Sequence, residues 1–141
     1  MDDERTQRLA AALLRDSSAG VDVVADAVVQ TWTRIDHALA PIIGAAGVAA
    51  MYRRSLHVCA LSHPALRHAL GPVQRRLEIE PLRAVLQAED ATTAAAQLGA
   101  ELLLTFDELL SRMVGPSLTE RLLRQAWNDL LDDAPDEDPI P

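Results

Sequence analysis

The chain has 141 residues, a single cysteine and a formal net charge of −8. This length suits one domain with a core of its own, and one cysteine excludes an intramolecular disulfide. No apolar run approaches the ~18 residues that cross a bilayer, and no signal-like segment opens the chain. We therefore expect a cytoplasmic protein with no membrane partner.

The negative charge is concentrated at the two ends. Residues 2–4 contribute three acids and residues 132–138 contribute five, so 13 of the 21 acids remain in the body, against 13 arginines and no lysine. A neutral body without a basic stripe predicts no nucleic-acid partner. The acidic, proline-punctuated tail at 132–141 is predicted to be disordered, which leaves one domain at 1–131.

Arginine in place of lysine, with alanine and leucine dominating the apolar residues, is typical of a GC-rich bacterial genome. Apolar residues at spacings of three and four predict helices, and no segment alternates long enough to be a strand. A first helix is expected over Asp2–Arg15. A second is expected over 22–43, with Asp22 as its N-cap and a bend at Pro41.

Gly44 and Gly47 are expected to form a turn before a third helix over Val48–Leu61. Prolines and a glycine interrupt the next stretch, so we expect only short helical turns at 64–70 and 73–77.

Pro81 can begin another short helix, and a long helix follows from about 91 to Gly115. Within it, Leu98–Val114 carries apolar residues well beyond one stripe, which predicts a central helix covered from several directions. The segment Ser117–Glu120 reads as a capping box that opens a last helix, ending near Leu131. The expected fold is an all-α bundle of six or seven helices.

An internal repeat is visible when Gly44 is aligned with Gly115. Each copy is a long amphipathic helix, a glycine stop and a second amphipathic helix, which predicts two pseudo-symmetric helical hairpins at about 22–62 and 91–131. In antiparallel hairpins Asp36 lies level with Arg53, and Asp107 with Arg124. We expect both pairs to form interhelical ion pairs.

The one cluster that could carry chemistry is His57, Cys59, His63 and His68. Thiolate and imidazole ligands suit zinc, copper or haem iron, so these residues are candidates for a metal or haem site. On one helix His57 and Cys59 would face about 200° apart, so a site requires the following loop to fold back. The alternative is a buried cysteine with histidines at a helix end.

A third interpretation is phosphotransfer. Bacterial histidine-phosphotransfer domains are also small helical proteins, and this chain is similar to them in size and class only. His37 and His68 are the candidate phosphate acceptors, but neither has a lysine nearby, because the chain contains none. We find no nucleophile elbow, phosphate-binding glycine loop, zinc-protease motif or dinucleotide fingerprint. For the Arg53-Arg54 and Arg75-Arg76 doublets we favour a solvated or salt-bridged face, with an anion grip as the alternative.

The sequence thus predicts a non-enzymatic interaction or regulatory module that requires no cofactor and acts through an unidentified protein partner. A small sensor that uses the histidine cluster is the first alternative, and a phosphotransfer protein is the second. Apolar surface beyond one stripe on the second helix, at Val24, Val28 and Trp32, predicts a homodimer interface.

Overall fold

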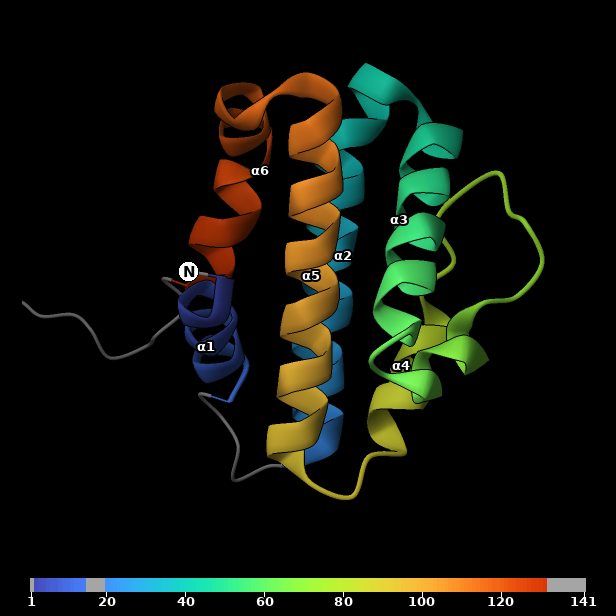
Figure 1. The fold of residues 1–141 in the computed structure, drawn as a ribbon, viewed down its shortest axis with the longest axis vertical. Coiled ribbons are helices and arrows are strands. Elements are labelled where there is room, and N and C mark those ends of the chain that lie inside the picture. Colours follow the sequence, from blue (N-terminus) through green and yellow to red (C-terminus); the bar gives the residue numbers. More distant parts are fainter. Residues whose placement is uncertain (1, 15–19, 132–141) are drawn as a thin grey trace, which may run out of the picture.

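The computed structural model describes residues 2–14 and 20–131, and over these residues it is an all-α bundle without strands (Figure 1). This confirms the predicted fold class. The helices are α1 (Asp2–Leu13), α2 (Val21–Ile43), α3 (Ala45–Ala60), the 3₁₀ helix η2 (Pro64–Ala69), α4 (Glu80–Gln87), α5 (Thr92–Val114) and α6 (Pro116–Leu131). No helix within these ranges combines the length and apolarity needed to cross a membrane. The predicted disordered tail lies outside the described residues.

Helices α2 and α5 run side by side in the same direction at the centre of the bundle (Figure 1). Helix α5 contacts α1, α2, α3, α4 and α6, as its apolar circumference predicts. Its Leu102, Leu103 and Phe106 have no exposed surface. Trp32 of α2 packs edge-on against Phe106, with the ring centroids 5.0 Å apart, and so joins the two helices in one core.

The two hairpins repeat each other closely. Helices α2 and α5 each have 23 residues, α3 and α6 each have 16, and all four helices begin and end at equivalent positions when Gly44 is aligned with Gly115. Each hairpin turns at one glycine of nearly identical conformation: Gly44 has φ 87° and ψ 151°, and Gly115 has φ 91° and ψ 151°. Residues other than glycine rarely adopt this backbone conformation, which explains the glycine at both turns.

Burial repeats as well, since every buried position of α2 has a buried equivalent in α5 under the same alignment. The pairs are Val24/Ala95, Ala25/Ala96, Val28/Gly99, Val29/Ala100, Thr31/Leu102, Trp32/Leu103, Ile35/Phe106 and Leu39/Leu110. The packing is also crosswise: α1 packs on α5, and α4 packs on α2. The described residues thus form two similar three-helix units related by an approximate two-fold.

Equivalent residues of the two central helices meet at a close contact. A Cβ added to Gly99 would lie 2.6 Å from Cγ2 of Val28, its own equivalent in α2. The approximate two-fold therefore passes near this contact. Valine on one helix and glycine on the other allow an approach that two larger side chains would prevent.

Several expected boundaries differ from the structure. Asp22 is not the N-cap of α2, because the helix begins at Val21 and Gly20 occupies the cap. Gly47 lies inside α3 rather than in the turn, since Gly44 alone reverses the chain. Residues 73–77 form no helical turn. Pro116 is the first residue of α6, so Ser117 lies within the first turn and not at the N-cap that a capping box requires.

Neither predicted ion pair forms within the described ranges. Asp107 is buried, accepts a hydrogen bond from Trp127 Nε1 at 3.2 Å and lies 3.4 Å from Nη2 of Arg5 on α1. Arg124 lies 4.0 Å from Glu120 of its own helix. Arg53 instead donates to the carbonyl of Gly71.

The ion-pair predictions were wrong because two residues at the same level of a hairpin need not have side chains that point toward each other. The position of each residue around its helix axis decides that direction. Asp107 is buried and Arg124 is exposed, and Arg53 is directed to Gly71 in the loop after η2. Asp36 retains a buried Oδ1 that has no hydrogen-bond partner among the described residues.

The residues predicted to form a homodimer interface belong to the core. Val24, Val28 and Trp32 have 0% exposure, because α4, α5 and α6 cover the faces of α2 on which they lie. The interface prediction for these residues is therefore wrong. Whether the protein is a homodimer stays a prediction.

The Val28–Gly99 contact gives a first prediction. Gly99→Ala should destabilise the fold by about 1 kcal/mol, because an overpacking cost of about 1–3 kcal/mol exceeds the helix-propensity gain of roughly 1 kcal/mol. Urea unfolding measures the change. In a Val28→Ala background the same substitution should be neutral or stabilising, and an equal loss in both backgrounds would contradict the close approach.

Candidate functional site

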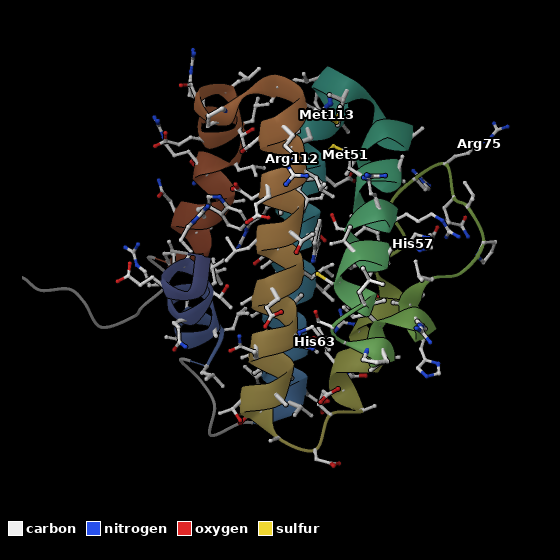
Figure 2. The ribbon with its side chains drawn as sticks, viewed as in Figure 1. Met51, His57, His63, Arg75, Arg112 and Met113 are labelled. Carbon is white, nitrogen blue, oxygen red and sulfur yellow. The ribbon has the colours of Figure 1, made fainter. Side chains whose placement is uncertain are left out.

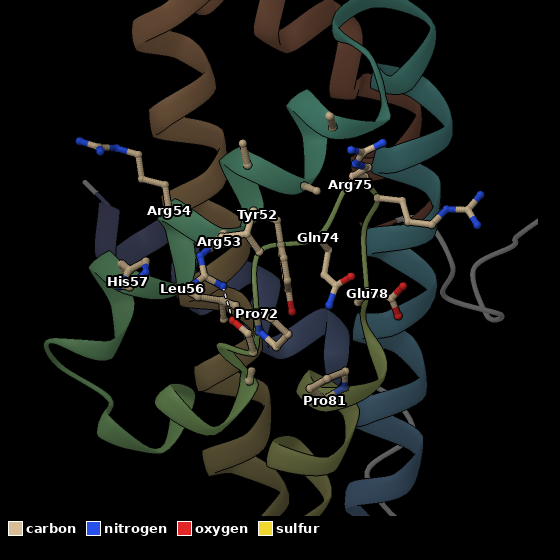
Figure 3. Close-up of a pocket in the computed structure, with 17 residues that line it drawn as sticks. Tyr52, Arg53, Arg54, Leu56, His57, Pro72, Gln74, Arg75, Glu78 and Pro81 are labelled. Carbon is tan, nitrogen blue, oxygen red and sulfur yellow. Dashed lines mark hydrogen bonds between the residues drawn. The ribbon is translucent and has the colours of Figure 1, made fainter.

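A pocket of about 620 Å³ lies between α3 and the segment 71–79 (Figure 3). One wall is a stripe of α3, at spacings of three and four, which presents Ala46, Ala49, Ala50 and Arg53. Alanine at three of these positions leaves room that larger side chains would fill. Leu56, which is almost fully buried, adds to the apolar surface of this wall.

The opposite wall is irregular backbone. Gly71-Pro72 follows η2, and Pro81 lies in the first turn of α4, so the chain between them has no continuous helix to pack against α3. Residues 71–76 are all exposed. The segment spans the gap as a loop, which leaves the hollow between itself and α3.

A much smaller hollow lies in the other half of the molecule, and it does not involve the α6 equivalents of Ala46, Ala49, Ala50 and Arg53, which are exposed. Arg5, Arg8, Leu9, Trp127 and Leu131 line a hollow of only about 60 Å³ between α1 and α6. Trp127 of α6 is the equivalent of Leu56 in α3 when the two hairpins are aligned at their glycines. In addition, α1 has 12 residues and α4 only eight. Leu56 and the loop at 71–79, which precedes the short α4, leave the larger hollow beside α3.

Tyr52 is the buried polar residue of the pocket wall. It is 5% exposed, its ring packs edge-on against Trp32 with centroids 4.9 Å apart, and its hydroxyl has no hydrogen-bond partner among the described residues. Figure 3 shows the hydroxyl directed toward the side of the pocket formed by Pro72 and Gln74. Burial raises the pKa of the phenol, so the hydroxyl remains a neutral hydrogen-bond donor.

The pocket is cationic although the protein is acidic. Arg53, Arg54, Arg75 and Arg76 line it, with Glu78 as the single acidic residue. Within the part of the chain that the structure describes, none of these four arginines forms an ion pair. The Arg53 guanidinium is held at the pocket by its bond to the Gly71 carbonyl (Figure 3).

The sequence offers an anion grip at Arg53-Arg54 and Arg75-Arg76 only as the less favoured interpretation, but it contains a further signal for this site. Residues 37–77 include no aspartate or glutamate, yet they contain five arginines and all four histidines. The net charge of the whole body is zero because the acidic helices offset this basic stretch. Charge counted in windows would have indicated a cationic face around α3 and the loop that follows η2.

The four residues of the histidine–cysteine cluster are not brought together. His57 faces the pocket, whereas His63 lies on the α5 side of α3 (Figure 2). Cys59 is buried and donates its thiol to Thr105 Oγ1 at 3.1 Å. His68 is exposed on η2. No group of three or more His, Cys, Asp or Glu side chains in the described ranges is placed to hold a metal ion.

The four residues form no common site because each side chain points toward a different part of the structure. Burial raises the pKa of the Cys59 thiol more than the hydrogen bond to Thr105 lowers it, so the thiol is not a prepared nucleophile or metal ligand. The phosphotransfer candidates His37 and His68 are both exposed. They lie on α2 and on η2, and phosphotransfer stays a prediction.

His63 forms the centre of a small polar group against α5. Its Nε2 lies 2.7 Å from Oε1 of Glu101, and Gln97 donates to Oε2 of the same carboxylate at 3.0 Å. Burial raises the pKa of Glu101, but the hydrogen bonds from Gln97 and His63, together with the His63 charge, lower it further than burial raises it. Glu101 therefore favours its ionised form in the folded protein.

No protein-family model matches the chain, and searches of curated proteins and of solved structures find no significant match.

The lowered pKa of Glu101 predicts a pH-dependent contribution to stability. Ionised Glu101 stabilises the fold above its ordinary pKa of about 4.3, and this contribution is lost as the pH falls through the lower folded value. Glu101→Gln should therefore destabilise the protein at pH 6, by less than about 1 kcal/mol because the side chain is partly exposed, and the effect should vanish near pH 3. Urea unfolding at both pH values checks it. An effect independent of pH would contradict the assignment, and the exposed Glu120→Gln serves as the control.

Proposed function

We propose that the protein is a non-enzymatic regulatory module that binds a small, largely apolar molecule in the pocket between α3 and the segment 71–79. The observation that carries the proposal is the pocket itself. Its volume of about 620 Å³ lies in the range of about 300–1,000 Å³ that is usual for small-molecule sites. The proposal keeps the sensor function weighed from the sequence but moves it away from the histidine–cysteine cluster.

The composition of the pocket supports binding. Ligand sites are mostly apolar with a few polar groups that fix orientation. Here the alanines of α3, Leu56, Pro72 and Val73 supply apolar surface, while Tyr52 and Arg53 supply donors.

Tyr52 and Arg53, the two donors of the pocket, are suited to binding rather than to proton transfer. The raised pKa of Tyr52 makes its phenol a poor proton acceptor near neutral pH, and arginine is always protonated. Neither group is prepared to transfer a proton. Hydrogen bonding and charge are what these side chains offer to a bound molecule.

The test is a titration with n-octanol, a neutral molecule with an apolar chain, followed through the methyl resonances of the labelled protein. We expect saturable shifts at Ala49 and Leu56. Ala50→Trp fills the pocket from the exposed side of α3 and should weaken binding by about tenfold or more, since the chain then loses most of its buried surface.

Ala11→Trp on α1 is the matched control, because it makes the same change at an exposed position outside the pocket. It should leave octanol binding unchanged. Shifts that are unaffected by Ala50→Trp, or that occur elsewhere in the protein, would contradict the proposal.

Protein–protein contact is a second candidate function, supported by the exposed apolar residues at the end of the bundle where both hairpins turn (Figure 1). Ile42 is 57% exposed, and Met113, its equivalent in the other hairpin, is 63% exposed. Leu118 adds to the same end. A second copy of the chain is the proposed partner, in place of the interface predicted at α2.

Light scattering tests this candidate. The wild type should have twice the mass of one 15.3 kDa chain, and the double variant Ile42→Ser/Met113→Ser should have the mass of one chain because the apolar contact is lost. Leu61→Ser, which changes a residue that is 82% exposed outside this end, is the control. A wild type of single-chain mass would reject the dimer.

A further inference from the structure

We propose that the ligand of this pocket is an amphipathic organic anion, in which an apolar body carries a carboxylate or a similar acidic group. The inference rests on the proposed function and names the class of molecule that the pocket binds. It depends on the charge around the pocket, the position of Arg53 and the unpartnered hydroxyl of Tyr52.

Charge is the first argument. Four arginines and one glutamate line the pocket of a protein whose net charge is −8. In the described ranges these arginines have no carboxylate partner within ion-pair distance. The Arg53 guanidinium lies at the pocket, whereas those of Arg54 and Arg75 point away from it (Figure 3) and add positive charge around its rim. A net positive charge around a partly enclosed space attracts an anion and repels a cation.

Arg53 places one positive charge at a defined position in the pocket. Its side chain extends from the α3 wall, and one guanidinium nitrogen donates to the Gly71 carbonyl (Figure 3). A guanidinium has five N–H donors, so this bond positions the group and leaves further donors for a carboxylate. The side chain is thereby held at the pocket before a ligand arrives, which lowers the entropic cost of binding.

Tyr52 supplies a second donor. A buried hydroxyl without a partner is costly in a protein interior, and an acceptor from a ligand would remove that cost. The hydroxyl has almost no accessible surface of its own, so contact requires a shift of the covering segment near Pro72 and Gln74. That segment is irregular and exposed, and it can move without breaking a helix.

The apolar walls of the pocket favour a ligand with an apolar body. Ala46, Ala49, Ala50 and Leu56 line one side, with Pro72 and Val73 opposite. Inorganic anions such as phosphate would leave this surface without a partner. A neutral apolar molecule would leave the arginines unpaired. An anion on an apolar body satisfies both parts of the pocket.

The experiment compares n-octanoate, n-octanol and n-octylammonium, which share one chain and differ in charge, by methyl-resonance titration of the full-length protein. We expect octanoate to bind about tenfold more tightly than octanol, as charge-assisted hydrogen bonds permit. Octylammonium should bind most weakly. Acetate, which has the charge without the chain, should not bind measurably.

Substitutions test whether Arg53 and Tyr52 contribute to octanoate binding. Arg53→Gln should bring octanoate affinity down to that of octanol and leave octanol unchanged. Arg124→Gln is the matched control, because Arg124 holds the equivalent position in α6 and lies outside the pocket. It should leave both affinities unchanged. Tyr52→Phe retains the ring and should weaken octanoate by about threefold or more, with a smaller effect on octanol.

The outcomes separate the two proposals. If octanol and octanoate bind the wild type equally, the pocket takes apolar molecules but the inference of an anion is wrong. If Arg124→Gln weakens octanoate as much as Arg53→Gln does, the preference reflects overall charge and the inference is also wrong. If neither ligand binds, the proposed function fails and the inference fails with it.

Discussion

The close approach of α2 and α5 is the constraint on which the rest of this structure depends. Val28 meets its own equivalent Gly99 there, and no Cβ fits on the glycine without moving the valine. With the two long helices this close, each offers its remaining apolar faces to the helices of the other unit, so α1 covers α5 and α4 covers α2. The core is therefore shared by both units, and neither unit could bury its long helix alone.

The pocket arises where this repetition is broken. The two units share helix lengths and turn geometry, but Trp127 in one is Leu56 in the other, and the 12-residue α1 corresponds to an eight-residue α4 preceded by a loop. The larger hollow lies between α3 and this loop. Because the scaffold is fixed by the shared core, the shape and charge of the hollow side can vary at little cost to stability. Sites with altered loops on a constant framework are a common basis for ligand binding.

The sequence predicted the hairpins because helical period and glycine stops are local signals, and Gly44 and Gly115 allow the same turn in each copy. It could not predict what each helix face touches. Asp36 and Arg53 lie at one height but point apart, and Val24 is apolar because it is buried in the core rather than at an interface. The sequence suggested an anion grip at the arginine doublets but did not favour it, because the pocket depends on a proline-broken loop and because the net charge of the whole body conceals the basic stretch at 37–77.

If the pocket between α3 and the segment 71–79 binds an amphipathic anion, an isotope-filtered NOE experiment on the labelled protein with n-octanoate will detect the bound molecule there most directly. We expect contacts from the octanoate chain to the methyl groups of Ala49, Leu56 and Val73, and none to those of Leu9 and Leu131 beside Trp127. Contacts to Leu9 and Leu131, or to Ile42 and Met113 alone, would contradict binding in this pocket.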